Sequence, residues 1–182
     1  MKVVGIVLAG GKSTRMGEDK AFLEWNGKLF LQYCIDALNL HCSEIFISGD
    51  NPRLVDFDLP VIQDLRKDEG PVTALASCFA SLSCDVAVVL SCDVPQIMQS
   101  DIASLLESHA SEQDVTMFSY QGKALPLVGV YSRKCFGQFT KAFEDRTQKL
   151  FGVIDKLNTK EIEFKGPKGL HNINTQKDLA VL

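Results

Sequence analysis

Short apolar runs alternate with segments of helical periodicity along the chain. The apolar runs, predicted to be strands, are 3–8, 44–48, 59–62, 85–90, 115–118 and 127–131. The segments whose apolar positions recur with the helical period are 30–40, 72–82, 100–109, 133–143 and 175–182. Strands that are apolar throughout are typical of a parallel sheet covered by helices on both faces. The pattern therefore predicts an α/β fold with a doubly wound, mostly parallel sheet flanked by helices, and ligand binding where the strands' carboxyl ends meet.

Turn and capping residues indicate where some elements begin. Asn26-Gly27 lies between two short apolar segments and predicts a tight hairpin turn. Ser100 and Thr175 are candidate N-caps of the helices that follow them. Since no repeat, low-complexity stretch or linker divides the chain, residues 1–182 are predicted to form a single domain.

Composition narrows the classes of partner and compartment. The 182 residues are 46% hydrophobic and 23% charged, which are values of a globular protein. A net charge of −4 argues against a broad nucleic-acid surface, although a small anionic ligand needs only a few local cations. The run 3–8 is too short for a signal peptide's apolar core or a membrane span. Six cysteines without paired spacing predict reduced thiols, and hence a cytoplasmic protein with no membrane partner.

The segment 8–20 follows the first predicted strand and carries the most chemistry. Its glycine pair allows backbone N–H groups to approach an anion closely. Lys12, Arg15 and Lys20 add three cations within nine residues. The loop is therefore a candidate polyphosphate site. The alternative is an ordinary solvated loop, because two acidic residues dilute the positive charge.

Two familiar phosphate motifs do not fit this loop. Gly-Lys-Ser at 11–13 resembles the end of a Walker A motif, which requires a glycine where Ile6 stands. The dinucleotide fingerprint fails because Gly10 and Gly11 are adjacent and the next glycine is Gly17. The chain is therefore predicted to be neither a P-loop NTPase nor a standard NAD-binding protein.

The pattern L-A-G-G-x-S-x-R-M-G-x-x-K over 8–20 resembles that of nucleotidyltransferases, which join a nucleotide to a phosphate and release pyrophosphate. The Gly-Gly form with Asp19-Lys20 is similar specifically to the molybdenum cofactor guanylyltransferases, and the resemblance extends over residues 4–182. It implies a Rossmann-like nucleotidyltransferase fold and catalytic roles for Arg15 and Lys20. It also implies nucleotide contacts by Leu8, Ala9, Gly10, Gly11 and Lys20.

Ser-Cys-Asp-Val-Pro at 91–95 ends the fourth predicted strand. A carboxylate at the carboxyl end of a central parallel strand points into the ligand crevice. Mg²⁺ is usually bound through one or two carboxylates together with substrate phosphates, so Asp93 is a candidate metal ligand. The alternative is an aspartate that caps the turn before Pro95. The resemblance, which includes C-D-x-P here, implies that Asp93 is catalytic and binds magnesium near the nucleotide phosphates.

Base recognition is predicted for Asp64, which follows the weak third strand. Its carboxylate can accept hydrogen bonds from the N1–H and the exocyclic amine of guanine, and the alternative is an ordinary loop carboxylate. The resemblance implies that Asp64 binds guanine. Ser48 stands where the family often has a base-contacting asparagine, and Ala74 replaces a family glycine. These departures bear on base specificity rather than on the reaction.

Acceptor recognition is predicted in two segments whose residues have structural explanations too. Pro126 lies in Leu-Pro-Leu at 125–127, which resembles a family segment near the acceptor but also reads as a buried strand. Asn172 and Asn174 lie in N-x-N-T, which resembles the family's closing segment, and Asn174 also suits a helix cap. The resemblance implies that these residues face the pterin.

Together these features predict transfer of GMP from GTP to the phosphate of molybdenum-molybdopterin with Mg²⁺ as cofactor, giving the guanine dinucleotide form and pyrophosphate. Proteins that deliver the pterin and receive the product are expected partners, and nucleic acid is not. The alternatives are a cytidylyltransferase or sugar- or polyol-phosphate nucleotidyltransferase of the same fold, and a non-catalytic nucleotide-binding protein.

Overall fold

A computed structural model describes residues 1–10, 19–67, 69–146, 149–166, 169–173 and 178. These residues form a seven-stranded sheet in the order β5-β4-β1-β6-β8-β7-β9. The strands are β1 (Val3–Leu8), β4 (Glu44–Ser48), β5 (Val61–Ile62), β6 (Val86–Ser91), β7 (Val115–Tyr120), β8 (Lys123–Ser132) and β9 (Thr159–Glu163). Neighbouring strands are parallel, except that β8 is antiparallel to both β6 and β7. The predicted α/β fold with a mostly parallel sheet is confirmed.

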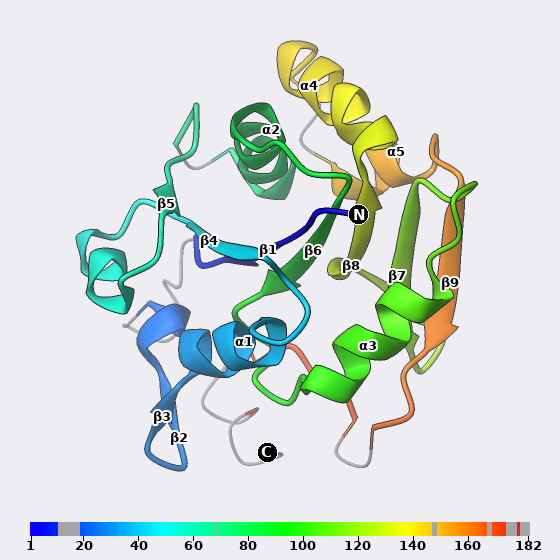
Figure 1. The fold of residues 1–182 in the computed structure, drawn as a ribbon. Helices are drawn as coiled ribbons and strands as arrows, with labels where there is room; N and C mark the ends of the chain where they lie inside the picture. The colour runs from blue at the N-terminus through cyan, green and yellow to red at the C-terminus, as the bar shows by residue number, and fades with distance from the viewer. Residues whose placement is uncertain (11–18, 68, 147–148, 167–168, 174–177, 179–182) are drawn as a thin grey trace.

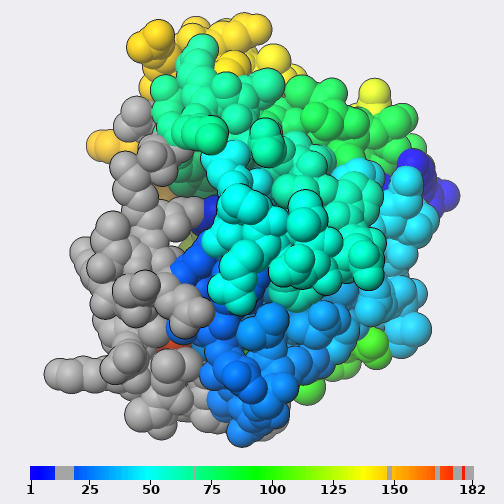
Figure 2. Space-filling model, turned by 90° about the vertical axis from the view of Figure 1, so that its left-hand side faces the viewer, coloured from blue at the N-terminus to red at the C-terminus, as the bar shows by residue number. Residues whose placement is uncertain are grey.

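Helices cover both faces of this sheet (Figure 1). One face carries α1 (Phe30–Leu38) and α3 (Gln99–Ser108), and the other carries α2 (Pro71–Ser81), α4 (Phe136–Glu144) and α5 (Leu150–Ile154). Short 3-10 helices are η1 (Lys20–Phe22), η2 (Pro52–Phe57) and η3 (Arg133–Cys135). Figure 2 shows the face of the molecule on which β5, an edge strand of the sheet, lies. The segment from β4 to β5, which includes η2, covers the centre of this face.

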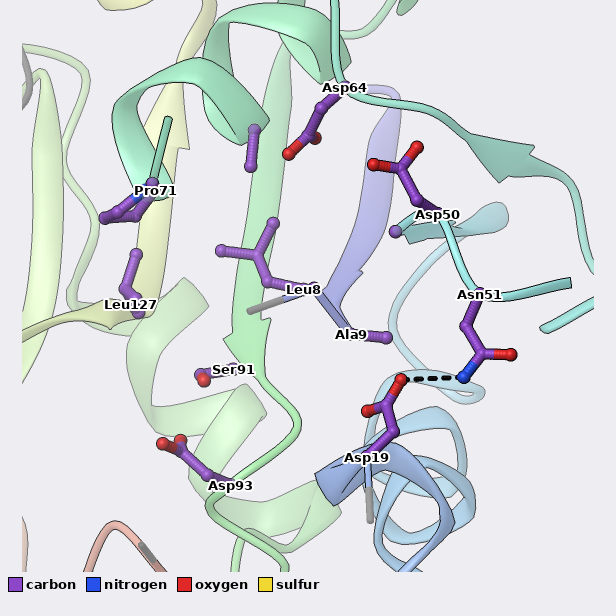
Figure 3. Close-up of a pocket in the computed structure, with 14 residues that line it drawn as sticks. Leu8, Ala9, Asp19, Asp50, Asn51, Asp64, Pro71, Ser91, Asp93 and Leu127 are labelled. Atoms are coloured by element: carbon purple, nitrogen blue, oxygen red, sulfur yellow. Dashed lines mark hydrogen bonds between the residues drawn. The ribbon is translucent and has the colours of Figure 1, made fainter. Parts of the chain in front are cut away.

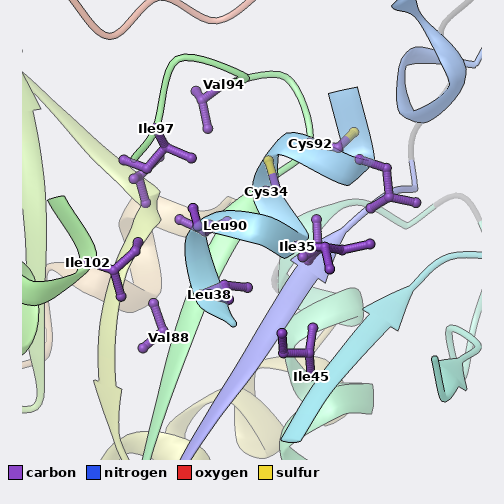
Figure 4. Close-up of a cluster of buried hydrophobic side chains, with 14 of the residues drawn as sticks. Cys34, Ile35, Leu38, Ile45, Val88, Leu90, Cys92, Val94, Ile97 and Ile102 are labelled. Atoms are coloured by element: carbon purple, nitrogen blue, oxygen red, sulfur yellow. The ribbon is translucent and has the colours of Figure 1, made fainter. Parts of the chain in front are cut away.

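The two helical layers bury opposite sides of the same strands. Val4, Ile6 and Leu8 of β1 belong to the cluster under α2 and α4, whereas Val7 belongs to the cluster under α1 and α3. Figure 4 shows the second cluster, in which side chains of α1 pack on β6. A side chain at Gly5 would come 2.9 Å from Leu38 Cδ1, so glycine allows α1 to lie close to the sheet. The central strands are therefore buried on both faces, as their apolar sequences predict.

The Asn26-Gly27 turn is confirmed, because it joins β2 (Glu24–Trp25) to β3 (Lys28–Leu29) with φ of 50° and 77°. The predicted N-cap Ser100 is wrong. Met98 occupies that position, and its backbone N–H donates to the Asp101 carboxylate at 2.8 Å. The reason is that the Asp101 carboxylate, in the first turn, accepts a hydrogen bond from a backbone N–H at this helix end, so no hydroxyl side chain is needed as a cap.

The bounds of some other helices and strands differ from those predicted from the sequence. The first turn of predicted helix 133–143 is the 3-10 helix η3, and β8 is longer than the apolar run 127–131. Strand β9 was not predicted, since its five residues are mostly polar and exposed. The predicted helix 175–182, with its cap Thr175, lies almost entirely outside the described residues. All six cysteines are free, and no helix among the described residues is long and apolar enough to cross a membrane.

Candidate functional site

A cavity of about 540 Å³ opens at the sheet edge where the parallel strands end. Its lining comes from the loops after β1, β4, β5 and β6, the start of α2, and β8 (Figure 3). The lining residues are Leu8, Ala9, Gly10, Asp19, Gly49, Asp50, Asn51, Asp64, Gly70, Pro71, Ala74, Ser91, Asp93 and Leu127. This is the edge at which the strand pattern predicts a ligand.

The chain after β1 forms the floor of the cavity. Leu8, Ala9 and Gly10 line it as predicted, and the Ala9 N–H donates to the carbonyl of Ser48 at 2.8 Å. A Cβ at Gly49 would come 2.8 Å from a side-chain carbon and 3.4 Å from the Ala9 carbonyl carbon, so only glycine fits there without a shift. The β1 and β4 ends are thereby held close together. Gly11 and Arg15, also predicted here, lie outside the described residues.

Lys20 and Asp93 meet beside the cavity although they are 73 positions apart in the sequence. Lys20 Nζ lies 3.2 Å from Asp93 Oδ2, and their side chains are 19% and 13% exposed. The Asp19 carboxylate accepts a hydrogen bond from the Ala21 N–H at 3.1 Å and so fixes the start of η1, where Lys20 stands. The fold therefore joins two of the three residues predicted to be catalytic.

The second oxygen of Asp93 is the feature that suits a metal. Oδ1 is buried and has no hydrogen-bond partner among the described residues, and Asp93 is only 9% exposed. A buried, unpartnered carboxylate oxygen is a hard donor of the kind that Mg²⁺ prefers. No group of three potential metal-ligating side chains occurs in the described part of the chain, so substrate phosphates would have to complete such a site.

The thiols next to Asp93 are poor metal ligands. Burial, and secondly the charge of Asp93, raises the pKa of Cys34 and of Cys92 far above the ordinary thiol value. Both thiols therefore stay protonated at neutral pH, while metals bind thiolate. Cys92 packs in the core under α1 (Figure 4).

Asp50 and Asp64 form the opposite end of the cavity, and their side chains point toward each other (Figure 3). Each has a buried Oδ1 without a hydrogen-bond partner among the described residues. Burial, together with the charge of Asp50, raises the pKa of Asp64 to about 6, and the Ser48 hydroxyl opposes this shift. The cavity thus has two polar ends, with Leu8 and Ala9 between them.

Ser48 and Asp50 differ from the sequence-based expectation. Ser48 is 1% exposed and does not line the cavity, but lies beneath Asp64 with Cys78 as another neighbour. Asp50, which the sequence did not single out, faces the cavity in its place. The available signal was its position two residues past the end of a strand predicted to lead to the ligand edge.

The start of α2 forms a further wall. Gly70 has φ of 85° and precedes Pro71, which opens the helix as its sequence position predicts. Ala74 lines the cavity. Its methyl group makes the cavity narrower here than would the glycine that the sequence resemblance implies at this position.

The predicted acceptor residues are not gathered in the described cavity. Pro126 is buried in an irregularity of β8, and its neighbour Leu127 lines the cavity. Asn172 is exposed, although the next residue, Ile173, donates its N–H to the Asp93 carbonyl at 2.9 Å. Asn174 lies outside the described residues. The 171–173 segment therefore flanks the Asp93 loop without entering the cavity.

This cavity has a lysine–aspartate pair at one end and hydrogen-bond acceptors at the other, an arrangement that suits a nucleotide with its phosphates. The sequence matches the MobA-like NTP transferase domain over residues 5–160, and the chain belongs to that family. The protein is therefore an enzyme that transfers nucleotides.

Individual relatives cover nearly the whole chain. A protein of Carboxydothermus hydrogenoformans, named probable molybdenum cofactor guanylyltransferase, is 27% identical and covers 97% of this chain and 92% of its own. A protein of Geobacillus sp. with the same name is 32% identical and covers 97% and 96%. The solved structure of molybdopterin-guanine dinucleotide biosynthesis protein A from Archaeoglobus fulgidus has a TM-score of 0.78 at 19% identity, covering 99% and 95%, and so shares the fold.

Proposed function

We propose that this enzyme transfers GMP from GTP to the terminal phosphate of molybdenum-molybdopterin, giving the guanine dinucleotide form and pyrophosphate. The observation that carries the proposal is the pairing of Lys20 with Asp93, whose second oxygen is unpartnered, in the same cavity as Asp64. The names of the relatives from Carboxydothermus and Geobacillus support the acceptor.

The Asp64 end of the cavity receives the base. Its carboxylate accepts hydrogen bonds from the N1–H and 2-amino group of guanine, which lie side by side on one edge. Cytosine presents acceptor atoms next to its single amine, so a carboxylate suits it less well. The backbone of Leu8, Ala9 and Gly10 lies between the base and the phosphates and binds the nucleotide along its length.

The Lys20 and Asp93 end receives the phosphates. Asp93 Oδ1, with the phosphate oxygens, would hold Mg²⁺, which neutralises phosphate charge when bound. Lys20 donates to the triphosphate and stabilises the charge that develops on the leaving group. Arg15 is proposed to do the same from the loop after β1.

The acceptor phosphate attacks the α-phosphorus in line with the bond to the β-phosphate. A new P–O bond forms while the bond between the α-phosphorus and the bridging oxygen breaks, and its electrons leave with pyrophosphate. The attacking oxygen is already anionic, so no general base is required. Catalysis is then positioning and charge stabilisation by the residues at the strand ends.

The test is pyrophosphate release from GTP, CTP and ATP, each with and without molybdenum-molybdopterin. Release from GTP that depends on the acceptor is expected. Release from CTP but not GTP would identify a cytidylyltransferase instead. Tight GTP binding without release under any acceptor would identify a nucleotide-binding protein.

A further inference from the structure

Asp50 is held in the wall of the cavity by both of its chain neighbours. The Gly49 N–H donates to the Ile62 carbonyl at 3.1 Å, which ties the end of β4 to β5. Asn51 accepts from the Arg53 N–H at 3.0 Å and donates to the Asp19 carboxylate at 2.9 Å (Figure 3). Because the backbone is fixed on both sides, the Asp50 side chain is presented to the cavity and cannot easily withdraw.

Asp50 and Asp64 come from the ends of adjacent strands and face each other in the same cavity (Figure 3). Both leave a buried Oδ1 without a partner among the described residues. Two facing carboxylates repel unless hydrogen-bond donors lie between them. Burial raises the pKa of Asp64 and the charge of Asp50 raises it further, which is the direction that such repulsion produces.

A second, independent observation indicates that this cavity is built for a ligand. At its other end Asp93, only 9% exposed, also directs an unpartnered buried oxygen into the cavity. The two carboxylates therefore belong to a pocket with unmet hydrogen-bonding capacity at both ends, not to a solvated acidic surface.

The donors that satisfy two facing carboxylates must lie close together and point in two directions. Guanine carries an N1–H and a 2-amino group with two N–H donors on one edge. Hypoxanthine has the same N1–H but no 2-amino group. We propose that Asp50 determines base specificity by accepting a hydrogen bond from the 2-amino group of guanine, while Asp64 accepts from N1–H and the amine's other hydrogen.

This inference rests on the proposed function, since it names how the same site selects its nucleotide. The test compares GTP with ITP, whose base is hypoxanthine, by kcat/KM and by equilibrium dissociation constants without acceptor. The wild type is expected to prefer GTP by at least about 10- to 100-fold, since each charge-assisted hydrogen bond to the amine contributes that much. In Asp50→Ala this preference should fall by about 10- to 100-fold, to what the contact between Asp64 and the amine leaves, because GTP weakens while ITP does not.

Two further variants make the comparison specific. Asp50→Asn keeps an acceptor oxygen without the charge and is expected to retain part of the GTP preference, which guards against a folding defect of Asp50→Ala. Asp56→Ala removes an exposed carboxylate from the neighbouring η2 and should leave the GTP-to-ITP ratio as in the wild type.

An unchanged ratio in Asp50→Ala, or equal losses for GTP and ITP, overturns the inference, as does a wild type that does not distinguish the two nucleotides. GTP binding without pyrophosphate release overturns the proposed reaction only. In that case the ratio of dissociation constants still decides the role of Asp50.

Discussion

At the scale of single residues, the two oxygens of Asp93 have separate environments. Oδ2 lies 3.2 Å from Lys20 Nζ, and Oδ1 is buried without a partner among the described residues. The lysine thus orients the carboxylate while leaving one oxygen for a ligand. An ion pair this well buried contributes more to orientation than to stability, because desolvation offsets its attraction.

Asp93→Asn should lower kcat by roughly 10²- to 10³-fold, in line with the loss of one preorganised charge. The amide keeps the shape and can still accept from Lys20, but it is a poor magnesium ligand. Magnesium titrations of pyrophosphate release measure the effect, with Asp155→Asn at the exposed end of α5 as the control. Full magnesium-dependent turnover in the variant would remove Asp93 as the metal ligand.

If Asp64 binds guanine as proposed, GTP binding should be sensitive to pH. Its raised pKa of about 6 means that the carboxylate is ionised above that pH and protonated below it. Since guanine N–H groups would bind only the ionised form, GTP affinity should be level above pH 6 and fall by up to about tenfold per pH unit below it. Binding near pH 6 should release protons, which calorimetry in buffers of different ionisation enthalpy detects. Asp64→Asn should release none at this site, and a flat affinity profile from about pH 5 to 7 would contradict the role.

At the scale of elements, β8 combines a reversed direction with an irregular register. Gly129 pairs with Met117 of β7, but Leu125 pairs with the next residue, Phe118, so the intervening residues of β8 bulge out. Leu127 on this bulge lines the cavity. A Cβ at Gly129 would come 2.7 Å from the Thr116 carbonyl oxygen, so glycine permits the close strand pairing beside it.

Tyr131→Phe tests whether this bulge is a fixed part of the site. The buried Tyr131 hydroxyl donates to the Pro126 carbonyl, and its removal leaves a buried acceptor unsatisfied. We expect a loss of about 1–3 kcal/mol in unfolding free energy and a higher KM, because Leu127 is no longer held. Urea unfolding and steady-state kinetics measure the two effects.

The matched control is Tyr33→Phe, whose hydroxyl donates to the Trp25 carbonyl at 2.9 Å in the β2–β3 hairpin, outside the cavity. It should lose less stability and keep the wild-type KM. A Tyr131→Phe variant that behaves like this control would show that the bulge does not support the site.

The elements that sequence predicted well are those whose burial decides their composition. β1 and β4 match their apolar runs because both faces are covered. β9 was missed because an exposed edge strand is held by backbone pairing to β7, which leaves no apolar pattern. The direction of β8 could not be predicted either, since buried parallel and antiparallel strands have similar compositions.

The residues of the candidate site also divide into those that the sequence predicts and those that it does not. Leu8, Gly10 and Asp64 were predicted from motifs at strand ends, where topology alone brings them to one edge. Ser48 was predicted in place of Asp50, because the direction of the Asp50 side chain is set after β4 ends at Ser48, where the alternation of strand side chains no longer applies. That direction depends on the tie between Gly49 and Ile62, which is a contact between separate strands.

At the scale of the whole molecule, one sheet couples two hydrophobic clusters. Cys34 lies in the cluster under α1, and Cys78 lies in the cluster under α2 on the opposite face, each with 0% exposure. β1 and β6 contribute side chains to both clusters, so neither helical layer can leave without exposing strands that the other layer also covers. The molecule should therefore unfold as one cooperative unit.

Thiol labelling in urea measures that coupling directly. Burial raises the pKa of Cys78 to about 12 and that of Cys34 further, so neither thiol reacts until the chain opens. Peptide-resolved labelling should give both cysteines the same opening free energy and the same urea dependence, equal to those of global unfolding. Cys42, which is only half-buried, should react at lower urea and serves as the internal control. A lower opening free energy at Cys34 than at Cys78 would mean that the α1 and α3 layer separates first, and that the sheet does not transmit stability between its faces.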